Sequence, residues 1–191
     1  MRGSLGARSR GAVDAPWPPM LLAGLPASVR ARPTSATLRA IMAERHITVR
    51  RQMAASCPSV WAVLADFPNL ANHWAGLKAT RRIGDQTRGI GARRQVDLKP
   101  VGALVETVTA WDEGRLIATA NQPSALVPFK RAESRLTLEP DGEGAAIIFD
   151  YWYVPRGGPI GRLTGTVIDR KLAADFEKML AAVEEAALNT A

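Results

Sequence analysis

The chain has 191 residues, 47% hydrophobic and 23% charged, which is ordinary globular composition and enough for one sizeable core. A single cysteine excludes an intrachain disulfide, and together with only two histidines it cannot supply a zinc-ligand set, so we expect a reduced protein with no metal and no cofactor. The net charge of +7 is concentrated in residues 1–41, which carry six arginines against one acidic residue. The nearly neutral remainder argues against a nucleic-acid-binding face.

Residues 1–41 contain five prolines and no periodic apolar pattern, so neither a helix nor a strand is expected there. We predict a disordered leader, or an extension produced by start-codon choice, because strand-like alternation begins just after Met42. A secretory or transit peptide is the alternative, although the apolar run "MLLAGL" is short and follows two prolines. The folded domain is therefore expected to span residues 42–191.

The domain begins with a predicted strand over residues 46–54, followed by a helix in "SCPSVWAVLAD" with Ser56 or Cys57 at its cap and Pro58 in its first turn. "FPN" ends this helix, and a second short helix is predicted over residues 70–74. Turn-rich stretches such as "GDQTRG" and "PDGEG" then separate a series of strand patterns. The predicted strands span residues 78–83, 90–99, 104–111, 116–121, 130–139 and 145–154. Their short connections indicate antiparallel neighbours.

After "PRGGPIG" the apolar residues recur at helical spacing, which predicts a long amphipathic helix of about five turns. Its apolar face carries Ile168, Leu172, Phe176, Met179 and Val183. No apolar run approaches the ~20 residues that cross a bilayer.

This order of elements resembles the START and birch-pollen-allergen (SRPBCC) superfamily, in particular the bacterial polyketide cyclase/dehydrase and lipid-transport family. The similar segments are "ITVRRQMAASCPSVWAVLADFPNLANHW", "GIGARRQVDL", "ALVETVTAWDEGRLI" and "FEKMLAAVEEAA". The resemblance implies an α+β helix-grip fold, in which a curved antiparallel sheet of about seven strands wraps around the long C-terminal helix. It also implies that the two short helices close one end of a hydrophobic cavity. Trp61, Phe67 and Trp74 would plug and line that end.

Alternation along the strands predicts which residues face the cavity. In residues 93–99 the uniformly polar parity is expected to point outward, which turns Arg94, Val96 and Leu98 inward. In residues 130–139 the same argument turns Lys130 and Ser134 inward.

Two strands are oriented by the resemblance. The inward glutamate of the family is carried onto Glu106, which also places Val108 inside. The last strand is apolar on both parities, and resemblance to the plant-hormone receptors of the superfamily puts Asp150 and Trp152 inside. Phe149, Tyr151 and Tyr153 would then lie outside. The predicted ligand-binding residues are Trp74, Arg94, Val96, Leu98, Glu106, Val108, Lys130, Ser134, Asp150, Trp152, Ile168, Leu172 and Phe176.

Three function classes remain open. The first is a cytoplasmic carrier or sensor that holds a hydrophobic small molecule, such as a lipid, an isoprenoid or a polyaromatic polyketide. The second is an aromatase/cyclase-type enzyme that uses the same polar residues for proton transfer, although no catalytic spacing is present and His73 is the only plausible imidazole. The third is an interaction protein, with Phe149, Tyr151 and Tyr153 as an outer partner or homodimer surface.

Overall fold

The computed structural model describes residues 44–156 and 158–190, with the side chains of residues 158–164 excepted. The predicted leader, residues 1–41, lies outside the described residues. In chain order the elements are β1 (Arg45–Met53), α2 (Cys57–Ala65), the 3-10 helix η3 (Phe67–Asn72), β2 (Leu77–Ile83), β3 (Arg93–Leu98), β4 (Ala103–Asp112), β5 (Leu116–Pro123), β6 (Phe129–Asp141), β7 (Gly144–Pro155) and α3 (Gly158–Leu188).

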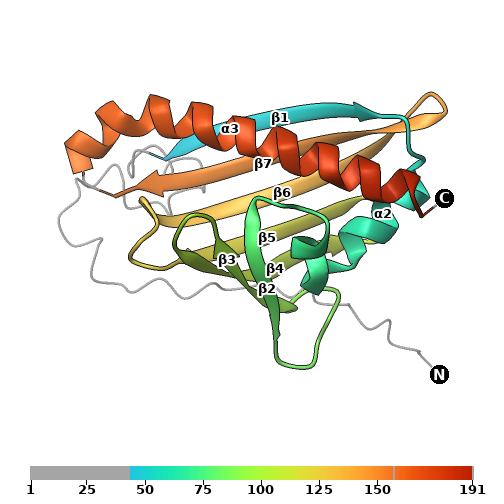
Figure 1. The fold of residues 1–191 in the computed structure, drawn as a ribbon, viewed down its shortest axis with the longest axis horizontal. Coiled ribbons are helices and arrows are strands. Elements are labelled where there is room, and N and C mark those ends of the chain that lie inside the picture. The colour runs from blue at the N-terminus through green and yellow to red at the C-terminus, as the bar shows by residue number, and fades with distance from the viewer. Residues whose placement is uncertain (1–43, 157, 191) are drawn as a thin grey trace, which may run out of the picture. The chain divides into compact units, whose positions relative to one another are not determined.

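The strands form one seven-stranded sheet in the order β1-β7-β6-β5-β4-β3-β2, and every neighbouring pair is antiparallel. Figure 1 shows α3 running along one face of this sheet and α2 at the end where the C-terminus lies. This is the helix-grip arrangement that the family resemblance implies, and it confirms the α+β fold class. No helix in the described part of the chain is long and apolar enough to cross a membrane.

Three local boundaries differ from the prediction. The second short helix begins at Phe67 rather than residue 70, because Pro68 ends α2 and also occupies the first turn of the 3-10 helix. Residues 90–92 are not part of β3, since Gly89 and Gly91 adopt positive φ angles of 79° and 92° and turn the chain there. The last helix has 31 residues and includes the segment "GPIG".

The short helix α2 packs its apolar side under α3. The Ser56 hydroxyl caps it by accepting a hydrogen bond from the Ser59 amide over 3.4 Å, and Pro58 occupies the first turn. Val60, Trp61 and Leu64 are buried in the main core with Leu180 and Val183 of α3, among others. Trp61 therefore serves the core, and its indole donates to the Glu113 carboxylate over 2.6 Å.

Side chains of α3 hold it to the sheet at two points. Asp169 accepts hydrogen bonds from the Arg45 guanidinium at 2.9 Å and from the Tyr153 hydroxyl at 2.7 Å. Near the other end of the helix, Glu184 accepts from Arg51 and from the Ala54 amide, both at 2.9 Å. These contacts fix the distance between the helix and the sheet.

The Glu184 contact predicts an acid-sensitive contribution to stability. Burial raises the pKa of Glu184, but the hydrogen bonds from Ala54 and Arg51 outweigh this and hold it below its usual value. A carboxyl with a depressed folded pKa stabilises the protein above its unfolded pKa, and this contribution is lost as the pH falls through the folded pKa. Glu184→Gln should therefore lower the free energy of unfolding by about 1–3 kcal/mol at neutral pH. The free energy of unfolding of this variant should also decrease less than that of the wild type as the pH is lowered.

Chemical denaturation as a function of pH measures this effect. The matched control is Glu185→Gln, because the adjacent Glu185 is exposed. If both variants lose stability in parallel with the wild type as the pH falls, the assignment to Glu184 is wrong.

The orientation predicted for the last strand is wrong. Phe149, Tyr151 and Tyr153 are buried at 5% exposure or less, and Phe149 and Tyr151 contact Phe176 of α3. Asp150 and Trp152 lie on the opposite face. The physical reason is that three aromatic rings bury far more apolar area than Ile148, Asp150 and Trp152 would.

Asp150, on the outer face of β7, is hydrogen-bonded to side chains of β1. Asp150 accepts a hydrogen bond from the Thr48 hydroxyl at 2.6 Å and lies 2.8 Å from Nε2 of His46. Trp152 stacks on the His46 ring at a centroid distance of 4.7 Å. The predicted partner surface of Phe149, Tyr151 and Tyr153 is therefore absent, because these side chains belong to the core.

Candidate functional site

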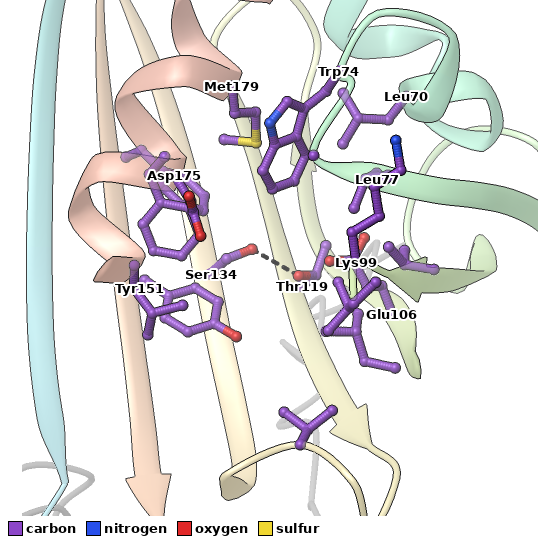
Figure 2. Close-up of a pocket in the computed structure, with 18 of the residues that line it drawn as sticks. Leu70, Trp74, Leu77, Lys99, Glu106, Thr119, Ser134, Tyr151, Asp175 and Met179 are labelled. Carbon is purple, nitrogen blue, oxygen red and sulfur yellow. Dashed lines mark hydrogen bonds between the residues drawn. The ribbon is translucent and has the colours of Figure 1, made fainter. Parts of the chain in front are cut away.

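A cavity of about 890 Å³ lies between α3 and the sheet. Its walls are mostly apolar, and every helix and strand except β1 contributes residues to them. Figure 2 shows Met179 and Asp175 of α3 and Tyr151 of β7 on one side, with Leu70, Trp74 and Leu77 on the other. The predicted site residues that line it are Trp74, Arg94, Val96, Leu98, Glu106, Ser134, Ile168, Leu172 and Phe176.

Strand pairing gathers inward-facing polar groups on adjacent strands of the sheet, and all of them except Asn121 line the cavity. Arg94 of β3 is the cross-strand partner of Glu106 of β4, which in turn is opposite Asn121 of β5. Two residues further along, Thr119 is opposite Ser134, and Ser134 is opposite Tyr151. Because cross-strand partners share a face, these side chains form a polar belt across an otherwise apolar surface.

Arg94 and Glu106 form an ion pair inside this belt. Nε of Arg94 lies 2.5 Å from Oε2 of Glu106, and Nη2 contacts the same oxygen. Nη1 donates to the Phe67 carbonyl, and the guanidinium lies 4.0 Å from the centre of the Phe67 ring. Arg94 is only 7% exposed, so solvent screens its attraction to Glu106 weakly.

The hydroxyl groups of the belt are joined to one another. Thr119 and Ser134 lie 2.7 Å apart, as the dashed line in Figure 2 marks, and the Thr119 hydroxyl donates to the Asn121 side-chain oxygen over 2.8 Å. Asn121 is 3% exposed, and its Nδ2 makes no hydrogen bond within ordinary geometric limits to the described residues. The amide nevertheless lies close enough to the Tyr151 hydroxyl to lower its pKa.

Tyr151 brings a hydroxyl to the cavity wall, as Figure 2 shows. Burial raises the pKa of this hydroxyl well above its usual value, and the negative charge of Glu106 adds to the rise, while the Asn121 side chain partly opposes it. Tyr151 therefore keeps its proton and acts as a neutral hydrogen-bonding group.

The cavity opens where exposed apolar residues of three segments meet it. Val101 in the β3–β4 turn, Leu126 in the β5–β6 loop and Val167 of α3 are 57%, 67% and 71% exposed, and all three line the cavity. Two exposed lysines line the same region. Lys99 donates to the Ala75 carbonyl, and Lys171 pairs with Asp175, each over 2.9 Å. We call this set of residues the rim.

Four of the predicted site residues do not line the cavity. Val108 is 1% exposed but packs with Phe67 and Ala92 in a separate apolar cluster. Lys130 is exposed, because the pairing of β6 with β7 shifts register between Phe129 and Arg131, so that Phe129 takes the inward position. Asp150 and Trp152 lie on the outer face of β7.

Sequence reasoning missed Thr119, Tyr151 and the rim. Thr119 shares a parity with Ile117 in the predicted strand over residues 116–121, so alternation could have placed both in the cavity wall. The rim residues Leu126 and Val101 lie in turns, where periodicity gives no orientation. His73 is half-buried and does not line the cavity. Among the described residues, no three histidine, cysteine, aspartate or glutamate side chains cluster as metal ligands would.

Known proteins resemble this chain in fold and in sequence family. No curated protein sequence matches it significantly. Among solved structures, TTHA0849 from Thermus thermophilus matches with a TM-score of 0.66 at 16% identity, covering 77% of this chain and 99% of that one. MLL2253 from Mesorhizobium loti matches with a TM-score of 0.59 at 18% identity, covering 77% and 99% of the two chains.

Ara h 8.0201 matches with a TM-score of 0.58 at 12% identity, covering 76% of this chain and 99% of that one. At these identities the structural matches show the fold alone. The sequence family is shown separately, since the family model described as polyketide cyclase / dehydrase and lipid transport matches residues 44–187. The chain therefore belongs to the polyketide cyclase/dehydrase and lipid-transport family.

Proposed function

We propose that the protein binds a hydrophobic small molecule, such as a lipid, an isoprenoid or a polyaromatic compound, in the cavity under α3 and acts as its carrier or sensor. The observation that supports this most strongly is the cavity itself. Its volume of about 890 Å³ lies in the range of small-molecule sites, and its mostly apolar walls carry one polar belt. Such a lining stabilises an apolar ligand by burial and orients it by a few hydrogen bonds.

The rim gives this ligand a route into the cavity. Val101, Leu126 and Val167 expose large apolar side chains on three separate segments, all at the cavity. A hydrophobic molecule that leaves a membrane or another protein would contact these side chains before it reaches the interior.

An enzyme of the cyclase type is the second candidate, and the family description is what favours it. Proton transfer requires a group that changes its protonation state near neutral pH. Glu106 is engaged by Arg94, and the raised pKa of Tyr151 keeps that hydroxyl protonated. The described groups of the belt therefore support positioning of a ligand better than acid–base chemistry.

A cavity-filling substitution tests the binding function. Leu172 is half-buried and lines the cavity, so Leu172→Trp should place an indole in the ligand volume. We expect the affinity for N-phenyl-1-naphthylamine, a neutral fluorescent probe, to fall at least about tenfold, the equivalent of about 1.4 kcal/mol. Fluorescence titration of the purified protein measures the dissociation constant.

Ala174→Trp is the matched control, because Ala174 is exposed two residues further along the same helix and does not line the cavity. It should leave the dissociation constant unchanged. Absence of probe binding by the wild type, or equal losses in the two variants, would contradict the proposal. Native mass spectrometry of the freshly purified protein would then identify any lipophile that accompanies it.

A further inference from the structure

Building on the proposed binding function, we propose that the cavity selects ligands that carry a neutral hydroxyl group at their buried end and rejects ligands that carry a carboxylate there. In the interior of the cavity, some groups of the polar belt are already occupied by protein partners, and others remain available to a ligand.

The only guanidinium that lines the described cavity is already neutralised. Two nitrogens of Arg94 contact Oε2 of Glu106, and the third donates to the Phe67 carbonyl. These contacts use three of the five N–H donors of Arg94, so a ligand carboxylate would have to share the guanidinium with Glu106. Two carboxylates on one guanidinium leave a net negative charge in a mostly apolar cavity, which is unfavourable.

The other cations of the lining lie at the rim. Lys99 and Lys171 are exposed, and Lys171 is paired with Asp175. The described interior of the cavity thus holds one positive and one negative charge that cancel. Moving a carboxylate into it is strongly unfavourable, because the carboxylate loses its hydration and meets no free cation.

The environment of Tyr151 also favours neutral groups over anionic ones. Burial and the charge of Glu106 both raise the pKa of the Tyr151 hydroxyl, which means that a negative charge at this wall is disfavoured. A ligand carboxylate would experience the same burial and the same repulsion.

A hydroxyl group, in contrast, finds complementary partners. Both contacts from Arg94 use Oε2 of Glu106, and Oε1 makes no hydrogen bond to the described residues, so it can accept one from a ligand. The Tyr151 hydroxyl can donate to the ligand oxygen or accept from it. Thr119 and Ser134 bond to each other, and Thr119 also donates to Asn121, so Glu106 and Tyr151 remain as the groups that recognise the ligand hydroxyl.

Three naphthalenes of nearly equal shape test this selectivity. At neutral pH, 2-naphthol carries a neutral hydroxyl, 2-methoxynaphthalene has no donor, and 2-naphthoate is anionic. We expect displacement of N-phenyl-1-naphthylamine to give 2-naphthol the tightest binding, with 2-methoxynaphthalene about fivefold weaker for one lost hydrogen bond. 2-Naphthoate should bind at least about 100-fold more weakly than 2-naphthol.

Variants identify the groups responsible. Tyr151→Phe should reduce the preference for 2-naphthol over 2-methoxynaphthalene, whereas the matched control Tyr153→Phe should not, because the Tyr153 hydroxyl is bonded to Asp169 and does not line the cavity. Glu106→Gln leaves the Arg94 charge unbalanced and should improve 2-naphthoate binding at least about tenfold.

The two proposals fail in different ways. Equal or tighter binding of 2-naphthoate than of 2-naphthol by the wild type would overturn the selectivity, even where the neutral probe binds. Failure of the neutral probe to bind would overturn the binding function as well. If Glu106→Gln does not fold, the comparison of Tyr151→Phe with Tyr153→Phe still decides, since neither removes a charge.

Discussion

Arg94→Ala is expected to lower the free energy of unfolding by about 3–5 kcal/mol. Arg94 is 7% exposed, and the side chain of its partner Glu106 is 14% exposed. The substitution leaves the Glu106 carboxylate in the cavity wall without its cation, and it leaves the Phe67 carbonyl without its hydrogen-bond donor. Chemical denaturation measures the loss, which would be smaller if water enters the cavity to solvate Glu106.

Arg93→Ala is the matched control, one residue earlier on the same strand. Arg93 is exposed on the opposite face of β3, so its removal should change the free energy of unfolding by no more than about 0.5 kcal/mol. Binding of N-phenyl-1-naphthylamine should weaken in Arg94→Ala and not in Arg93→Ala. If both substitutions had equal effects on stability and on binding, the role given to the polar belt would be wrong.

Phe176→Ala should also cost about 3–5 kcal/mol of unfolding free energy, because it removes a buried ring from the contact between α3 and the sheet. Phe176 is 7% exposed, and its ring centre lies 4.7 Å from that of Phe149 and 4.9 Å from that of Tyr151. The same ring lines the cavity. Its loss should therefore enlarge the ligand volume and weaken the binding of a tightly fitting probe.

Glu177→Ala provides the comparison for Phe176, since Glu177 is the adjacent exposed residue of α3. It should be close to neutral in both thermal and chemical denaturation. A Phe176→Ala protein as stable as the wild type, with unchanged probe affinity, would show that the ring contributes neither to the core nor to the site.

The sequence alone was sufficient for the elements and for part of the cavity wall. Strands and turns could be predicted because alternation and turn residues are local properties of the sequence. The apolar helical stripe from Ile168 to Val183 is also a local property. The inward placement of Arg94, Val96 and Leu98 was readable for a similar reason: the other parity of β3 is uniformly polar, so only one orientation avoids burying it.

The tertiary structure alone determined the side-chain orientations that the local sequence pattern leaves ambiguous. Strand β7 is apolar on both parities, and the packing of Phe149 and Tyr151 on Phe176 selected the orientation opposite to the predicted one. The irregular pairing at Phe129 and Arg131 turned Lys130 outward, although strict alternation would have kept it inside. Each outcome depends on contacts between segments far apart in the chain, and the energy of such contacts is invisible to a periodicity that spans only a few residues.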